Sequence, residues 1–175
     1  LVSWKNRVDA YLDALEKEID YTAAKFYHKH LNSIYIGGGT PTTLEPYQLD
    51  RLIRKIKCSF DLSDCLEFTV EAGRPDSITR EKLEVLRKWG ITRISINPQT
   101  MQQRTLDLIG RRHSVEQTVE SFKIARELGF DDINMDLIMG LPEESLEDVR
   151  DTLGQIMQLK PDNLTVHSLA LKRAA

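Results

Sequence analysis

The feature that most constrains the fold is a regular alternation of short apolar runs with helical patterns. Five runs of strand character recur about every 25 to 40 residues, which is the spacing of strand–helix units. They are Ser33–Ile36, Leu66–Val70, Arg93–Ile96, Ile133–Met139 and Leu164–Ser168. Strands joined by single helices run parallel, so the chain is predicted to form an α/β domain with a parallel sheet.

Helical patterns lie before and between these runs. Apolar residues follow the i, i+3, i+4, i+7 spacing of an amphipathic helix in five segments: Val8–Ile19, Leu49–Ile56, Leu83–Trp89, Val115–Ala125 and Leu146–Met157. Ser114 and Gln117 form a capping box, Gly90 and Gly129 are placed to end helices, and Pro161 ends the last one. We therefore expect residues 1–175 to form a single domain.

The polar residues of the strands alternate with apolar ones and gather on one face. That face holds Thr69 and Glu71, Ser95, Asn97 and Gln99, Asn134 and Asp136, and Thr165 and His167. In a barrel the apolar face packs on outer helices and the polar face lines the interior. This pattern favours a partial parallel (β/α) barrel of the TIM-barrel type that lacks its first strand, which we expect before Leu1. An open two-layer sheet with its polar face in water is the alternative.

Composition excludes several function classes. The 175 residues carry a net charge of −3 without a basic block, which gives no indication of a nucleic-acid partner. No apolar run approaches the roughly 20 residues of a membrane helix, and no signal peptide is visible. Cys58 and Cys65 fit no disulfide scaffold or zinc motif. We expect a cytoplasmic protein with no membrane partner.

The turn Gly37-Gly38-Gly39-Thr40-Pro41 directly follows the first apolar run. Three residues without a Cβ allow a ligand to approach the backbone closely. The spacing is neither that of a dinucleotide fingerprint nor that of a Walker loop. A flexible turn is the alternative, but a turn rarely needs three glycines, and we interpret this one as a ligand-binding loop.

Glu71, Gln99 and Asp136 lie toward the carboxyl ends of their strands, where the active sites of barrels form. Each alone fits a cap or a supporting group, but a carboxylate inside a barrel is costly without a partner. Arg111 stands in a loop beside Arg112, where it either is solvated or binds a carboxylate ligand bidentately. The sequence thus shows ligand-binding groups and no catalytic or metal-ligating residue.

Several motifs together identify a family. They are Tyr35–Thr42, Glu71, Arg93–Gln99, Gly110-Arg111 and Asn134–Pro142. With these motifs the chain resembles the radical S-adenosylmethionine enzymes, specifically the family of oxygen-independent coproporphyrinogen III oxidase. Residues Thr165–Arg173 resemble the branch called coproporphyrinogen dehydrogenase rather than the haem chaperones.

The resemblance implies an S-adenosylmethionine cofactor and a 4Fe–4S cluster on a partial (β/α)6 barrel. In such enzymes a 5′-deoxyadenosyl radical takes hydrogen from the propionates of coproporphyrinogen III, and loss of carbon dioxide leads to protoporphyrinogen IX in haem biosynthesis. A porphyrinogen is thus the implied substrate, and the electron donor is unknown. A haem chaperone with the same barrel is one alternative, and a non-radical barrel that binds a nucleoside-like metabolite is another.

The resemblance also implies roles for individual residues. Gly38, Gly39 and Thr40, in the turn that begins at Gly37, are expected to hold the cofactor's amino group together with Glu71. Arg111 is expected to bind the cofactor's carboxylate. Gln99 and Asp136 are expected to contact the ribose or a second cofactor molecule.

The chain departs from the family pattern in three places. Its C-x-x-x-C-x-x-C cluster motif does not occur in the 175 residues and is expected before Leu1, so this chain alone is predicted to be inactive. Cys58 and Cys65 lie on the wrong side of the glycine turn to replace it. The segments Asn97-Pro98-Gln99 and Glu71–Pro75 also differ from the usual sequences, by a stiffer backbone in the first and a longer turn in the second.

Overall fold

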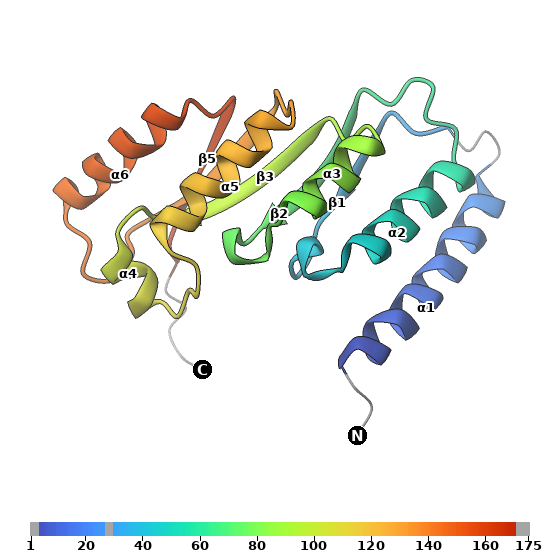
Figure 1. Cartoon of the computed structure of the whole chain (residues 1–175), viewed down its shortest axis with the longest axis horizontal. Helices are drawn as coiled ribbons and strands as arrows, with labels where there is room; N and C mark the ends of the chain where they lie inside the picture. The colour runs from blue at the N-terminus through green and yellow to red at the C-terminus, as the bar shows by residue number, and fades with distance from the viewer. Residues whose placement is uncertain (1–3, 27–29, 171–175) are drawn as a thin grey trace.

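The computed structural model describes residues 4–26 and 30–170, which form a half-barrel of five parallel strands with helices (Figure 1). The end of the motif at Thr165–Arg173 lies outside the described residues. The strands are β1 (Ser33–Ile36), β2 (Glu67–Gly73), β3 (Arg93–Gln99), β4 (Ile133–Met139) and β5 (Asn163–Ser168). They pair in the order β1-β2-β3-β4-β5, which confirms the predicted parallel sheet.

Each strand pairs with the next one along the chain, and this order places the helices. Right-handed crossovers between successive strands bring their helices to the same face of the sheet. The helices are α1 (Trp4–Lys25), α2 (Pro46–Ser59), α3 (Arg80–Lys88), α4 (Gln103–Leu108), α5 (Val115–Glu127) and α6 (Leu146–Leu159). Short 3₁₀ turns η1 (Pro41–Thr43) and η2 (Pro75–Ser77) follow β1 and β2. Helix α4 was not predicted.

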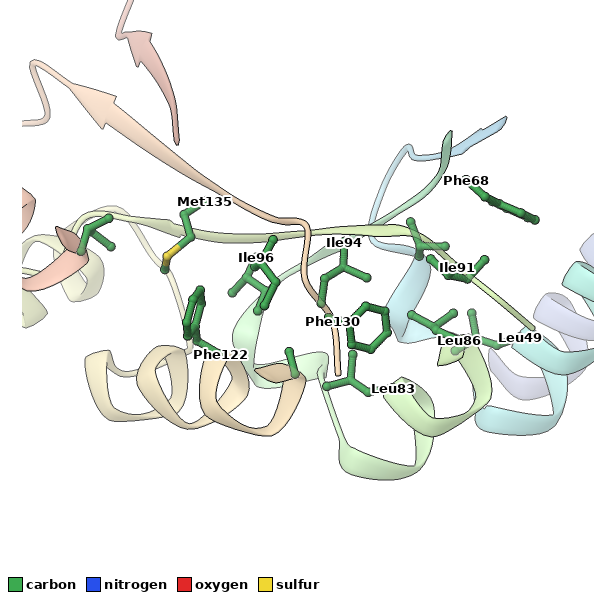
Figure 2. Packing of buried hydrophobic residues seen from close by; sticks show 14 of the residues in the cluster. Leu49, Phe68, Leu83, Leu86, Ile91, Ile94, Ile96, Phe122, Phe130 and Met135 are labelled. Carbon is green, nitrogen blue, oxygen red and sulfur yellow. The ribbon is translucent and has the colours of Figure 1, made fainter. Parts of the chain in front are cut away.

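The hydrophobic core lies between the sheet and these helices. Ile94, Ile96 and Met135 extend from the strands toward Phe122 and Phe130 (Figure 2), and all five side chains are buried. Burial of one such side chain contributes about 1.5–3 kcal/mol. The apolar face of the strands thus packs on the helices, as predicted.

Strand β5 is an exception to this packing. Leu164 and Val166 have the spacing of core residues, but they are 37% and 50% exposed. The alternation correctly identifies an apolar face, yet burial of that face also needs a helix against it. Within the described residues, no helix follows β5.

Several helices end as the sequence predicts. Gly90 and Gly129 adopt φ of 74° and 82°, and the residue after each donates its N–H back to the last turn of the helix. Ser114 and Gln117 form the predicted capping box. Helix α6 ends at Leu159, and the next residue, Lys160, adopts a left-handed conformation directly before Pro161.

The pairing register shifts in the last part of β2 and of β3. In β2 the shift falls between Glu71 and Gly73, and in β3 between Ile96 and Gln99. Such bulges redirect side chains at strand ends. Gln99 has a φ of 69° and pairs with Leu137, so the alternation that placed Gln99 on the face of Ser95 and Asn97 ends before it.

Candidate functional site

The glycine turn after β1 is built so that two of its positions need glycine. A Cβ on Gly37 would lie 2.3 Å from Cε1 of Tyr35 and 3.0 Å from Oε2 of Glu71. Gly38 has a φ of 116°, which side chains rarely tolerate. At Gly39 the Cβ position has no heavy atom within 4 Å. The turn is therefore packed on Glu71 at one end and open to a ligand at the other.

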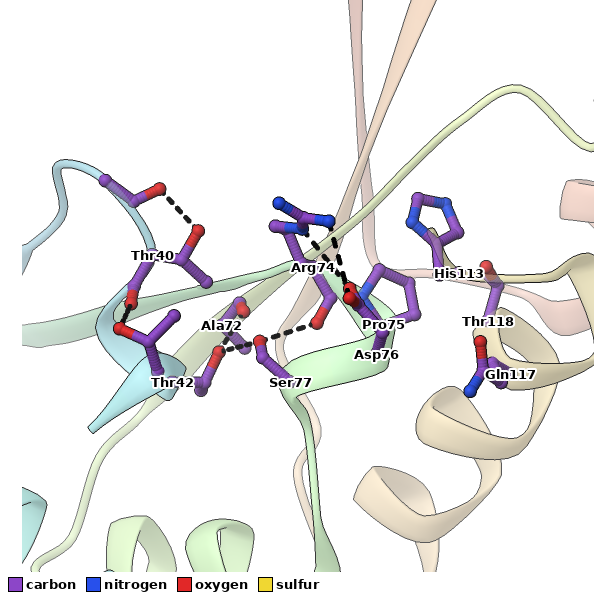
Figure 3. A network of polar contacts seen from close by, with 12 residues as sticks. Thr40, Thr42, Ala72, Arg74, Pro75, Asp76, Ser77, His113, Gln117 and Thr118 are labelled. Atoms are coloured by element: carbon purple, nitrogen blue, oxygen red, sulfur yellow. Dashed lines mark hydrogen bonds and ion pairs between the residues drawn. The ribbon is translucent and has the colours of Figure 1, made fainter. Parts of the chain in front are cut away.

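Hydrogen bonds join this turn to the turn that follows β2 (Figure 3). The buried hydroxyl of Thr42 donates to the carbonyl of Ala72 and lies 2.6 Å from Oγ of Ser77. Lys82 on α3 donates from Nζ to the carbonyls of Thr42 and Ser77, at 2.6 and 3.0 Å. Burial lowers the pKa of Lys82. Lys82 was not predicted to belong to the site, because its position in α3 is typical of a surface lysine.

Glu71 receives hydrogen bonds from both sides. The hydroxyl of Tyr35 donates to its Oε2 at 3.3 Å, and Nδ2 of Asn97 donates to its Oε1 at 3.4 Å. Burial, followed by the charge of Glu71, raises the pKa of Tyr35 and keeps its phenol protonated. Tyr35 was not among the predicted site residues, although it lies two residues before Gly37 and pairs with Thr69.

Asp136 lies in β4 with two partners. Nδ2 of Asn134 donates to its Oδ1 at 2.6 Å, and Nε2 of His167 lies 3.8 Å from its Oδ2. Asp136 also lines a polar cavity of about 300 Å³ on the inner face of the sheet. The cavity is lined by Tyr35, Glu67, Thr69, Arg93, Ser95, Asn134, Asp136, Thr165 and His167. The cavity thus gathers most of the polar residues that the alternation had grouped, but Glu71, Asn97 and Gln99 are not among the residues that line it.

Gln99 is buried at the end of β3, and a histidine supports the residue before it. Nε2 of His113 donates to the carbonyl of Pro98 at 3.2 Å. His113 is fully buried, its Nδ1 has no partner among the described residues, and burial lowers its pKa. His113 is therefore neutral at pH 7 and fixes the backbone at the bulge of β3. Its role was missed because its partner is 15 residues away in sequence.

Arg111 is positioned by the end of α4. Gly110 has a φ of 71°, and its backbone N–H donates to the carbonyl of Asp107. The backbone N–H of Arg111 donates to the carbonyl of Leu106, and these two bonds form a helix-ending motif. The guanidinium of Arg111 is half-buried and forms no hydrogen bond or ion pair with the described part of the chain. Burial, with the nearby charge of Arg74, lowers the pKa of Arg111. A half-buried cation in this state favours an anionic ligand.

Together these groups suit a zwitterionic ligand with hydroxyl groups. Open backbone and Glu71 fit an ammonium group, Arg111 fits a carboxylate, and Asp136 fits hydroxyl donors. Among the described residues, no group of three or more His, Cys, Asp or Glu side chains is arranged to hold a metal ion. None of the helices in the described ranges is long and apolar enough to cross a membrane.

A comparison with family models places this site in a known context. The model described as the radical SAM superfamily matches residues 5–156. The chain belongs to the radical SAM superfamily. Members of this family use S-adenosylmethionine with a 4Fe–4S cluster, and the open glycine turn, Glu71 and Arg111 fit the charged groups of S-adenosylmethionine. The described residues offer no ligand set for the cluster.

Similar proteins carry two kinds of name. The chain is 45% identical to the oxygen-independent coproporphyrinogen-III oxidase-like protein HemZ of Bacillus subtilis, over 97% of the chain and 34% of that protein. It is 41% identical to the heme chaperone HemW of B. subtilis, over 94% of the chain and 44% of that protein.

A solved structure agrees with the fold. Coproporphyrinogen III oxidase (HemN) from Escherichia coli superposes with a TM-score of 0.89 at 35% identity, over 97% of this chain and 39% of that one. The chain therefore spans less than half the length of the relatives that it matches.

Proposed function

We propose that the protein binds S-adenosylmethionine at the carboxyl ends of its strands, with the amino-acid part of the cofactor between the glycine turn and Arg111. The observation that carries this proposal is the half-buried Arg111, whose guanidinium forms no hydrogen bond or ion pair with the described residues, although the charge of Asp76 lies near it. A guanidinium binds a carboxylate through two parallel hydrogen bonds, and S-adenosylmethionine presents one carboxylate.

The other site residues complete the proposed binding mode. The backbone of Gly37–Thr40 and the carboxylate of Glu71 bind the ammonium group of the cofactor. Gln99 and Asp136 hydrogen-bond to the ribose or to a second cofactor molecule. S-adenosylmethionine, when bound, supplies the radical chemistry of the family, and these residues bind and orient it.

For the intact protein we propose oxidative decarboxylation of coproporphyrinogen III to protoporphyrinogen IX, with the porphyrinogen as substrate. The identity of 45% to an oxidase-like protein and the TM-score of 0.89 against an oxidase support this assignment. The second candidate is a haem chaperone, which the identity of 41% to the HemW of B. subtilis favours.

Cofactor binding is tested by equilibrium dialysis of the intact protein with labelled S-adenosylmethionine. Arg111→Gln is expected to weaken binding at least tenfold, because the charge-assisted bonds to the carboxylate are lost. Arg112→Gln is the matched control, because Arg112 is the exposed neighbour of Arg111 and carries the same charge. This variant should bind S-adenosylmethionine as tightly as the wild type does. Equal effects of the two substitutions would refute the proposed binding mode.

The two candidate activities are separated with anaerobically reconstituted intact protein. Incubation with coproporphyrinogen III, S-adenosylmethionine and a reductant should release carbon dioxide if the protein is an oxidase. Stable capture of haem without carbon dioxide release would instead support the chaperone. Iron and sulfide analysis of the same sample reports whether it carries a cluster.

A further inference from the structure

A continuous series of hydrogen-bonded side chains crosses the inner face of all five strands. Its members are Tyr35 on β1, Glu71 on β2, Ser95 and Asn97 on β3, Asn134 and Asp136 on β4, and Thr165 on β5. We call this series the inner-face network. Its two carboxylates, Glu71 and Asp136, are both residues of the proposed cofactor site.

Asn134 is the branch point of the network. Its Nδ2 donates to Oδ1 of Asp136 at 2.6 Å and to Oγ of Ser95 at 3.0 Å. Its Oδ1 accepts from the hydroxyl of Thr165 at 3.0 Å. A flipped amide would place its oxygen against the carboxylate of Asp136, so the orientation is fixed. Asn134 is buried, and each of these bonds is expensive to leave unmade.

The direction of donation continues from Asn134 to Glu71. Because Ser95 accepts from Asn134, its own hydroxyl is free to donate to Oδ1 of Asn97, at 2.8 Å. This bond turns Nδ2 of Asn97 toward Oε1 of Glu71. At each end of this path an amide N–H therefore donates to a carboxylate. Asn97 donates to Glu71, and Asn134 donates to Asp136.

We propose that Asn134 is a positioning residue, which through Ser95 and Asn97 holds the side chains of Glu71 and Asp136 at a fixed separation. The inference rests on the proposed function, because a fixed separation of the two side chains matters only if both contact the same bound S-adenosylmethionine. Glu71 meets the ammonium group of S-adenosylmethionine and Asp136 meets its ribose, so a rigid pair of carboxylates is matched to one extended conformation of the cofactor. Preorganisation of this kind lowers the cost of binding.

The substitution Asn134→Asp tests this role, because it replaces a donor with an acceptor at nearly constant shape. At pH 8 the new carboxylate repels Asp136, and affinity for S-adenosylmethionine relative to wild type should fall at least tenfold. At pH 5.5 a proton shared between the two carboxyl groups restores a donor, since carboxyl pairs this close titrate in coupled steps. At this pH the affinity of the variant for S-adenosylmethionine should return to within about threefold of the wild-type affinity.

Other titratable and charged groups face the same cavity, namely Tyr35, Glu67, Arg93 and His167. Expressing each affinity relative to wild type at the same pH removes the part of their contribution that is common to both proteins. Asn163→Asp is the matched control, because the exposed Asn163 pairs with Asn134 in the register and its Nδ2 donates to Oδ1 of the half-buried Asp132 at 2.8 Å. The affinity of Asn163→Asp for S-adenosylmethionine should stay within twofold of the wild-type affinity at both pH values.

Ser95→Ala provides a second, uncharged variant if a new buried carboxyl group prevents folding. It removes the donor that orients Asn97, and binding should weaken three- to tenfold to the same extent at pH 5.5 and pH 8. Wild-type affinity of both variants at pH 8 would overturn the proposal. A loss in Asn134→Asp that does not depend on pH would also overturn it.

A crystal structure of ligand-free Asn134→Asp at pH 8 separates failure of this inference from failure of the proposed function. The side chain of Asp136 is expected to turn away from position 134, whether or not the protein binds S-adenosylmethionine. An unmoved Asp136 would refute its positioning by Asn134. Absence of binding by the wild type, with Asp136 displaced in the variant, would instead refute the cofactor assignment and retain the positioning role.

Discussion

On the outer face of the sheet, Phe68, Ile94 and Met135 pack against helices, whereas on the inner face Thr69, Ser95 and Asn134 lie among hydrogen-bonded polar groups. The outer contacts are non-directional, so many apolar side chains of similar volume satisfy them. The inner contacts depend on which atom donates and which accepts. A change on the outer face is therefore expected to alter stability, and a change on the inner face to alter ligand geometry.

The largest expected effect on stability comes from the outer face. Phe130 is 1% exposed, and Phe130→Ala should lower the free energy of unfolding by about 3–5 kcal/mol, because it leaves a cavity. Urea denaturation measures this loss. Phe26→Ala is the control at a 52% exposed phenylalanine and should change the value by less than about 0.5 kcal/mol. S-adenosylmethionine affinity of folded Phe130→Ala should match wild type, and a tenfold loss would contradict the separation of the two faces.

An intermediate effect is expected where the faces meet, at the turns that follow β1 and β2. Thr42→Val keeps the shape of the side chain but leaves the carbonyl of Ala72 without its donor. The free energy of unfolding should fall by about 1–3 kcal/mol, and S-adenosylmethionine should bind more weakly as the glycine turn loosens. Thr43→Val removes an exposed hydroxyl that donates to the carbonyl of Thr40, and it should lower the free energy of unfolding by less. An equal loss of unfolding free energy in the two variants would show that the burial of Thr42 is unimportant.

The smallest expected effect is a pH dependence that arises from His113. Its pKa is lowered in the folded protein, so below the unfolded value of about 6.5 the unfolded chain binds a proton that the folded chain does not. Stability should therefore decrease as the pH falls below about 6.5, with a slope of at most about 1.4 kcal/mol per pH unit. Urea denaturation between pH 7 and pH 5 measures the slope.

His113→Gln isolates this contribution. Glutamine can still donate to the carbonyl of Pro98 but does not titrate, so the variant should show a shallower decrease than wild type. An identical slope in the two proteins would assign the pH dependence to other groups.

Parts of the fold that depend on nearby residues were predictable. The capping box at Ser114 and the glycine ends at Gly90 and Gly129 are local, since each involves residues only a few positions apart. Helix α4 was missed because six residues are too few to show a helical period, although Gly110 marks its end. That omission matters because the end of α4 positions Arg111.

The sequence by itself determined the parallel sheet, its polar face and the glycine turn, because residue periodicity and glycine content are properties of short segments. Only the tertiary structure decided that Glu71 and Asp136 are joined through Asn97, Ser95 and Asn134. It also decided that the guanidinium of Arg111 forms no hydrogen bond or ion pair with the described residues, and that Gln99 leaves the strand's alternation. These outcomes depend on strand register and bulges, which are set by contacts between residues 20 or more positions apart.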